Sequence, residues 1–150
     1  MIYLKTREEI ELLRENNILV SRALAEIGRA IKPGVTTKEL NDIAEAFIRA
    51  NGAVPAFLGY QGYPASACIS VNEQVVHGIP SDYVIKNGDI VSVDLGTIMK
   101  SFVGDSAYTF AVGTVSDEVR QLLEVTKEAL RKGAAQAKAG NRVGDISAAV

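Results

Sequence analysis

The chain has 150 residues, of which 47% are hydrophobic and 23% are charged, and its formal net charge is -2. This size and composition are typical of one globular domain with a substantial core, and they exclude a disordered chain. No run of five like charges occurs, which argues against a nucleic-acid footprint or a membrane-surface patch. We therefore expect neither a nucleic-acid partner nor a membrane partner.

Cysteine content and the N-terminus indicate the compartment. Cys68 is the only cysteine, so an intramolecular disulfide is excluded. The chain enters charged residues at Lys5 and Arg7 without an apolar signal segment, and no stretch approaches membrane-spanning length. We expect a cytoplasmic protein.

Two capping boxes predict two helices in the first third of the chain. Thr6-Arg7-Glu8-Glu9 begins a long amphipathic helix, which Lys32-Pro33-Gly34 ends. Asn17 interrupts its apolar stripe, whose members are Ile10, Leu13, Val20, Leu24, Ile27 and Ile31. Thr36-Thr37-Lys38-Glu39 begins a second helix, which ends at Gly52. Core packing accounts for both helices.

A glycine-rich aromatic loop at 57–64 follows, and it contains Tyr60 and Tyr63. The two tyrosines either wall a pocket or form a lid over the core, and the sequence favours neither. Ala67 to Val71 then reads as a strand, and Gln74-Val75-Val76 as a second short strand.

His77, the only histidine, follows that second strand and precedes a Gly-Ile-Pro turn. A lone histidine is more often a surface or structural residue than a catalyst. Its position at a strand end nevertheless lets the imidazole project toward a cleft.

Two apolar runs, 90–96 and 103–110, flank a short connection, Met99-Lys100-Ser101, and predict a β-hairpin. A hairpin centred near Met99 and Lys100 places Asp94 opposite Asp105, with Cβ atoms about 5 Å apart. Two carboxylates at that distance repel each other, and a divalent cation between them would relieve the repulsion. Alternatively, one aspartate caps a turn near Gly96 or Gly104.

The last third predicts two more helices. Ser116-Asp117-Glu118 begins one that ends at Ala139-Gly140, and Asp145 to Val150 begins another. This helix pair echoes the first pair, with Lys32 and Lys138 in equivalent positions 106 residues apart. Either the chain contains a weak internal repeat, or two helical hairpins resemble each other by coincidence.

Several motifs together give the chain a close resemblance to the N-terminal part of bacterial type I methionine aminopeptidases. They are Gly59-Tyr60-Gln61-Gly62-Tyr63-Pro64, Cys68 to Glu73, His77-Gly78-Ile79-Pro80, Gly88-Asp89-Ile90-Val91, Val93-Asp94-Leu95-Gly96 and Gly104-Asp105-Ser106-Ala107. The resemblance implies an α/β (α+β) pita-bread fold, as in creatinase and the aminopeptidases, with the first half and the start of the second half present. We expect one incomplete catalytic domain over 1–150, with a first pseudo-repeat over about 1–113 and the start of a second over about 114–150.

The resemblance also implies two divalent metal ions, of Co, Mn, Fe or Zn, held by two aspartates, one histidine and two glutamates. Asp94 and Asp105 match the aspartate positions, and His77 matches a catalytic histidine that contacts the substrate without ligating metal. Tyr60, Tyr63 and Cys68 match positions lining the methionine pocket, where His77 also contacts the substrate. A metal-bridged water would attack the first peptide bond and so remove the initiator methionine from nascent chains.

This sequence also departs from the family pattern. Gln61 and Val103 stand where many members carry histidine, and the ligating histidine and glutamates belong to the family's second half. We therefore expect the 150-residue chain alone to be inactive. The expected partner is the N-terminus of nascent polypeptides, near the ribosome, and the complete enzyme is expected to be a monomer. The alternatives are a non-catalytic pita-bread binding module and a creatinase-like or prolidase-like hydrolase.

Overall fold

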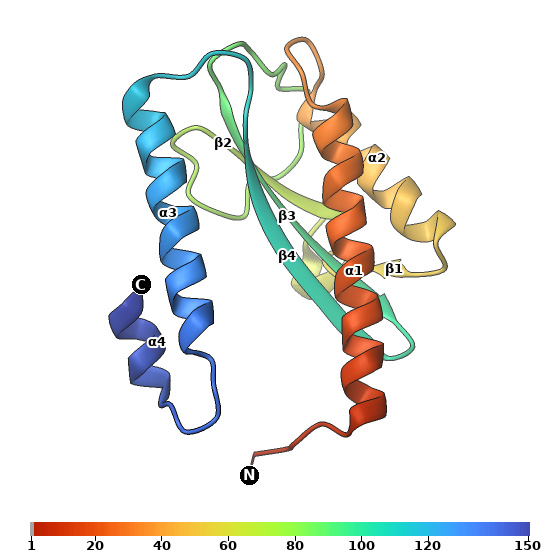
Figure 1. The fold of residues 1–150 in the computed structure, drawn as a ribbon. Helices are drawn as coiled ribbons and strands as arrows, with labels where there is room; N and C mark the ends of the chain where they lie inside the picture. Colours follow the sequence, from red (N-terminus) through yellow and green to blue (C-terminus); the bar gives the residue numbers. More distant parts are fainter. Residues whose placement is uncertain (1) are drawn as a thin grey trace. The chain divides into compact units, whose positions relative to one another are not determined.

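The computed structural model describes residues 2–150, whose helices and strands are shown in Figure 1. In chain order they are α1 (Arg7–Ala30), α2 (Thr37–Ala50), β1 (Val54–Pro55), the short 3-10 helix η1 (Tyr60–Gly62), β2 (Ala67–Val71), β3 (Ile90–Met99), β4 (Phe102–Ala111), α3 (Asp117–Gln136) and α4 (Val143–Ala149). The chain divides into two units, one ending at Thr114 and one beginning at Val115. Each unit is described separately below.

Both predicted capping boxes are confirmed. The backbone N–H of Glu9 donates to Thr6 Oγ1 at 3.2 Å, and the N–H of Thr6 donates to Glu9 Oε2 at 2.8 Å. Thr36 and Glu39 exchange the same pair of hydrogen bonds at 3.1 and 2.7 Å. These bonds satisfy amide groups that a helix start leaves without partners, so local sequence is enough to fix where α1 and α2 begin.

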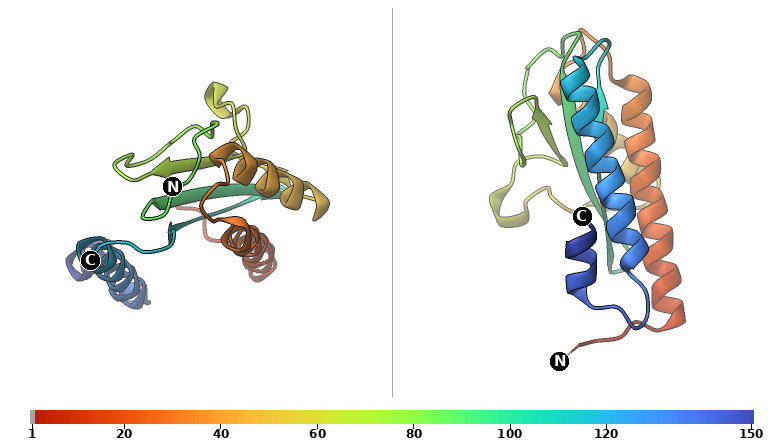
Figure 2. Two further views of the ribbon diagram at one scale, coloured as in Figure 1. Left: turned by 90° about the horizontal axis from the view of Figure 1, so that it is seen from above. Right: turned by 60° about the vertical axis from the view of Figure 1, so that its left-hand side comes forward.

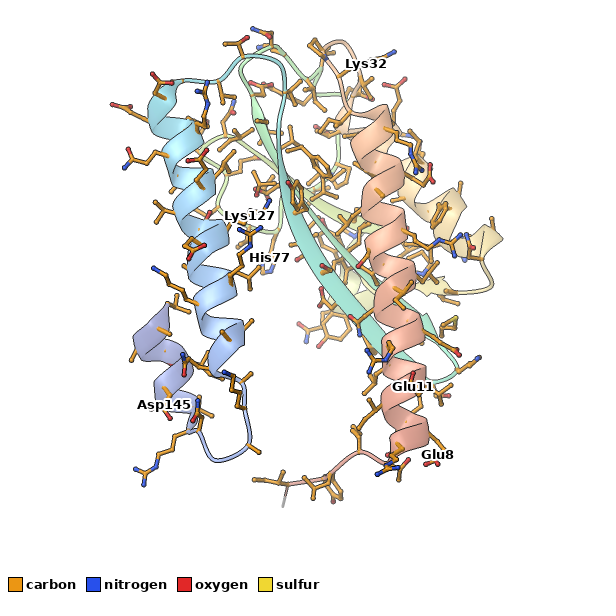
Figure 3. The ribbon with its side chains drawn as sticks, viewed as in Figure 1. Glu8, Glu11, Lys32, His77, Lys127 and Asp145 are labelled. Atoms are coloured by element: carbon orange, nitrogen blue, oxygen red, sulfur yellow. The ribbon has the colours of Figure 1, made fainter. Side chains whose placement is uncertain are left out.

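The apolar stripe of α1 is buried only from its middle onward. Ile10 is 43% exposed, whereas Val20 and Ile27 are fully buried in the core. Glu8 and Glu11 lie on the exposed first turns of the helix (Figure 3). The first buried residue of α1 is Asn16, one position before the asparagine that interrupts the stripe.

The first unit is built around β3, which pairs antiparallel with β4 along one edge and with β1 and β2 along the other. Side chains alternate between the faces of a strand, and Val91, Val93 and Leu95 are fully buried in the core beneath α1 and α2. The intervening residues of β3, including Asp94, therefore project from the opposite face. In the right-hand view of Figure 2, α1 and the loop at 57–64 lie on opposite sides of the sheet.

The hairpin prediction is confirmed, but its predicted register is wrong. The turn contains only Lys100 and Ser101, with φ of 51° and 68°, and Met99 pairs with Phe102. Such left-handed two-residue turns usually contain Asn-Gly or Asp-Gly, and this one does not. As a result Asp94 pairs with Ala107, while Asp105 pairs with Gly96.

The second short strand, expected at Gln74-Val75-Val76, is also a wrong prediction. These residues form an irregular segment in which Val75 is 86% exposed. The side chain of Gln74 turns back to accept from the N–H of Val71 at 3.0 Å. A two-residue apolar run carries too little information to distinguish a strand from an exposed loop.

The second unit consists of α3 and α4. Ser116 caps α3 as predicted, with its hydroxyl accepting from the N–H of Val119 at 3.3 Å. Gly133 is buried, and a Cβ there would lie 2.8 Å from a methyl group of Val150 and 3.6 Å from a methyl group of Ile146 on α4. Whether the two units are internal repeats stays a prediction. Among the residues that the structure describes, no helix combines the length and apolar character needed to cross a membrane.

Candidate active site and metal centre

All six residues predicted for the site line one cavity of about 640 Å³ in the first unit. They are Tyr60, Tyr63, Cys68, His77, Asp94 and Asp105, and the wall is completed by Phe57, Gln61, Gly62, Pro64 and Ile79. Neither tyrosine belongs to the hydrophobic core cluster. The loop at 57–64 is thus a cavity wall and not a lid over the core.

Asp94 and Asp105 share the cavity face of the β3–β4 hairpin as diagonal neighbours. Asp105 lies directly across from Gly96, two residues along β3 from Asp94 and therefore on the same face. A Cβ at Gly96 would lie 2.5 Å from the ring of Phe57, so glycine lets that ring pack beside the two aspartates. The hairpin supplies both acids, and Phe57 supplies the apolar wall next to them.

The environment of Asp94 disfavours a negative charge. Burial, the charge of Asp105 and a hydrogen bond with Asp105 raise the pKa of Asp94 from 3.8 to about 6, while the charge of His77 opposes this rise. A carboxyl group held in this way gains from any cation placed beside it. The two carboxylates therefore favour binding of a cation between or beside them.

The donor chemistry of this pair fits a divalent cation, but the pair is only part of a ligand set. Carboxylate oxygens suit Mg, Ca and Mn, and with nitrogen ligands they also suit Fe, Co and Zn. Across residues 2–150, no group of three or more His, Cys, Asp or Glu side chains could hold a metal ion. A tightly bound ion would need ligands in addition to Asp94 and Asp105.

The backbone around His77 is held under strain. His77 has a φ of 59°, an unfavourable region for a residue with a side chain. The next residue is clamped to β2, since the N–H of Gly78 donates to Ser70 Oγ at 3.0 Å and its carbonyl accepts from the N–H of Ile69 at 2.8 Å. A Cβ on Gly78 would lie 2.2 Å from the Ile69 carbonyl oxygen, so only glycine allows this approach. The clamp fixes the loop from which His77 projects (Figure 3).

Tyr63 and Cys68 add neutral groups to the cavity. The hydroxyl of Tyr63 lies 3.1 Å from the carbonyl oxygen of Ala67 and 3.0 Å from that of Gly78, so it links β2 to the His77 loop. Burial, followed by the neighbouring Cys68, raises the pKa of Tyr63. Burial also raises the pKa of the Cys68 thiol, with Asp94 and Asp105 adding to the effect. A protonated thiol is a poor nucleophile, so Cys68 contributes a neutral, polarisable sulfur to the cavity wall.

Sequence reasoning missed the residues of α1 that bond to the hairpin carrying Asp94 and Asp105. Asn16 is fully buried on α1 and bonds to both strands of the hairpin, and Asn17 accepts from the backbone N–H of Asp105 at 3.3 Å. The only available signal was the polar interruption of an otherwise apolar helix face.

Known proteins that resemble this chain in sequence and structure identify the class of protein to which it belongs. Residues 11–150 match the sequence profile of metallopeptidase family M24, and the chain belongs to that family. Membership implies divalent metal as the cofactor. The chain is 49% identical over its full length to methionine aminopeptidase 1 of Bacillus subtilis strain 168, and 49% identical over 98% of its length to a methionine aminopeptidase of Clostridium acetobutylicum. It spans about 60% of the length of these curated relatives, which is their N-terminal part.

Solved structures confirm the fold. A methionine aminopeptidase from Thermotoga maritima superposes on the whole chain with a TM-score of 0.96 at 40% identity, and the match covers 61% of that structure. A Xaa-Pro dipeptidase from Bacillus anthracis matches 87% of the chain with a TM-score of 0.76 at 30% identity, and 35% of that structure is covered. The predicted pita-bread fold and the predicted resemblance are both confirmed.

Proposed function

We propose that the chain forms the N-terminal portion of a metal-dependent exopeptidase that removes the initiator methionine from nascent polypeptides. One observation carries this proposal: Asp94 and Asp105 share one face of a hairpin and line the same cavity as His77. The relatives named methionine aminopeptidase support it, and the T. maritima structure matches better than the Xaa-Pro dipeptidase.

In this proposal each cavity residue has a distinct role. Asp94 and Asp105 would hold two divalent ions, of Co, Mn, Fe or Zn, and such ions would supply an activated water molecule at neutral pH. Tyr60, Tyr63 and Cys68 surround the methionine side chain, because aromatic rings and a neutral thiol suit an unbranched thioether.

His77 provides a hydrogen bond to the peptide group next to the scissile bond. Because the backbone of its loop is held to β2, this backbone does not have to be ordered when the substrate binds, and this lowers the entropic cost of the reaction. His77 is the catalytic residue of this chain under the proposal.

We further propose that a histidine and two glutamates from additional sequence complete the ligand set. The presence of only two candidate carboxylates in the cavity supports this, as does the 60% coverage of the relatives. The boundary at Thr114 supports the division into a first pseudo-repeat over about 1–113 and the start of a second. We therefore expect the chain alone to bind cations weakly and not to hydrolyse peptides.

The test measures Mn²⁺ binding by the chain itself, and peptide hydrolysis by a C-terminally extended form of the chain. Binding is followed by the loss of the free Mn²⁺ signal in electron paramagnetic resonance, and hydrolysis by release of methionine from Met-Ala-Ser. We expect Asp94→Ala and Asp105→Ala each to weaken Mn²⁺ binding at least about tenfold, because each removes a charged ligand. Asp82→Ala removes an exposed aspartate outside the cavity and should leave binding unchanged. Equal Mn²⁺ affinity in the wild type and Asp94→Ala would refute the metal role.

Hydrolysis requires the complete ligand set, so it is measured after a C-terminal extension of the chain with the remaining part of the B. subtilis relative. Met-Ala-Ser should then be cleaved, and Asp94→Ala should abolish cleavage. Preference for Xaa-Pro peptides over Met-Ala-Ser would instead favour a prolidase-like activity.

A further inference from the structure

We propose that Asn16 and Asn17 are positioning residues that lock α1 to the β3–β4 hairpin and thereby set the spacing of Asp94 and Asp105. The inference rests on the proposed metal role of the two aspartates. It assigns a function to the asparagine pair that interrupts the apolar face of α1.

Asn16 joins both strands of the hairpin at the turn end. Its amide nitrogen donates to the carbonyl oxygens of Thr97 on β3 and Phe102 on β4, at 3.2 and 2.6 Å. Its amide oxygen accepts from the hydroxyl of Thr97, which is also fully buried. A buried amide with both donors and its acceptor satisfied specifies one arrangement of its partners, because any slip leaves a polar group unpaired.

The hairpin approaches α1 closely at this point. Gly104 pairs with Thr97, and a Cβ at Gly104 would lie 2.9 Å from the backbone carbonyl carbon of Asn16. Glycine therefore lets β4 rest directly on the helix backbone. The close contact at Gly104 and the Asn16 hydrogen bond to Phe102 hold β4 against the helix, while the two bonds to Thr97 hold β3.

Asn17 extends the lock to an aspartate itself. Its side-chain oxygen accepts from the backbone N–H of Asp105 at 3.3 Å. Among the residues described by the structure, β4 pairs only with β3, so this amide would otherwise lie on an open sheet edge. Asp105 is thus held from the helix side through its backbone while its carboxylate faces the cavity.

The experiment compares Asn17→Ala with a matched control, Asn51→Ala. Both asparagines donate to a carbonyl oxygen four residues earlier in their own helix, at 2.8 Å in each case. Only Asn17 also bonds to the hairpin. Asn16→Ala is less informative alone because the residue is fully buried and the variant could fail to fold.

Two readouts are measured. In metal-free protein, hydrogen exchange of the Asp105 amide should accelerate about fivefold in Asn17→Ala, as expected for loss of one hydrogen bond. Mn²⁺ affinity should fall by a similar factor of about five. Asn17→Asp keeps an acceptor oxygen and should restore slow exchange, and Asn51→Ala should change neither readout.

The outcomes separate the two proposals. If Mn²⁺ binds through Asp94 but Asn17→Ala changes neither Asp105 exchange nor Mn²⁺ affinity, the positioning role is overturned and the metal role stands. A lower melting temperature with unchanged Mn²⁺ affinity also overturns it, because that is a structural role only. If Mn²⁺ binding does not depend on Asp94, the proposed function fails, and the positioning role falls with it.

Discussion

Replacing Asp94 by asparagine should make the metal-free protein more stable at neutral pH. In the wild type, folding places an ionised carboxylate in a partly buried position beside Asp105, and this arrangement raises the pKa of Asp94 to about 6. Asparagine keeps the size of the side chain and removes its charge. The substitution therefore removes an electrostatic cost that the wild type bears for its site.

The magnitude follows from the pKa. A rise from 3.8 to about 6 corresponds to at most about 3 kcal/mol, at about 1.36 kcal/mol per pKa unit. Asp94 is only partly buried, and solvent screening reduces the expected gain to about 1–2 kcal/mol. Because the folded-state pKa is raised, the folded protein binds the proton more tightly, and wild-type stability falls as pH rises from about 4 to about 6. Asp94→Asn should lack that fall.

Urea unfolding followed by far-UV circular dichroism, in chelator at about pH 4 and about pH 7.5, measures this effect. The variant should gain stability over the wild type only at the higher pH. Asp82→Asn, at an exposed position, is the control and should behave like the wild type at both values. Mn²⁺ should stabilise Asp94→Asn less than it stabilises the wild type, because the variant binds the ion more weakly. If Asp94→Asn and the wild type are equally stable at the higher pH, the electrostatic account of the site is wrong.

Three further predictions concern the surroundings of the site and the second unit. Gly78→Ala should lower the free energy of unfolding by about 1–3 kcal/mol, because its Cβ would lie 2.2 Å from a backbone oxygen. Gly144→Ala is the control, because a Cβ at Gly144 meets open space, and it should not lower the free energy of unfolding. Equal effects of the two substitutions on the urea midpoint would contradict the close packing of Gly78 against β2. Tyr83→Phe removes a 2.9 Å hydrogen bond to Asp89 and should cost about 1 kcal/mol at neutral pH. Burial opposes ionisation of Asp89, but its hydrogen bonds outweigh burial and lower its pKa. The loss of stability in Tyr83→Phe should therefore vanish as acid protonates Asp89. A loss that does not depend on pH would exclude a coupling between this hydrogen bond and the ionisation of Asp89. Leu130, 70% exposed on α3, should contribute to binding of a hydrophobic dye, and an unchanged signal in Leu130→Lys would show that this face binds none.

Sequence predicted those parts of the fold whose causes are local. Thr6 and Thr36 begin their helices through bonds to residues three positions away, and those bonds are visible in the sequence as capping boxes. The gathering of acids, tyrosines and His77 around one cavity came from motif resemblance, since residues such as Tyr60 and Asp105 meet only in the folded chain. Their individual roles stay predictions.

The wrong hairpin register has a different cause, which is a backbone conformation that the residue type does not predict. Lys100 and Ser101 adopt the left-handed region without being glycine or asparagine, and His77 does the same. In each case the surrounding structure imposes the conformation. The contacts of Asn16 were equally hidden, because its partners lie more than 80 positions away in sequence.

The observed register of the hairpin gives Asp94 and Asp105 a different spacing from the predicted one. Moving the turn to Lys100-Ser101 shifts the pairing by two residues, and side chains alternate with a period of two, so both aspartates stay on the same face. Their separation nevertheless grows from that of a directly opposed pair, about 5 Å between Cβ atoms, toward that of a diagonal pair, about 7–8 Å. A diagonal pair therefore leaves more room between the two Cβ atoms than an opposed pair does. Gly96, directly across from Asp105, contributes no side chain to that space. The turn thus sets the room between the acids, and the contact of Asn16 with both strands beside it keeps that turn in place.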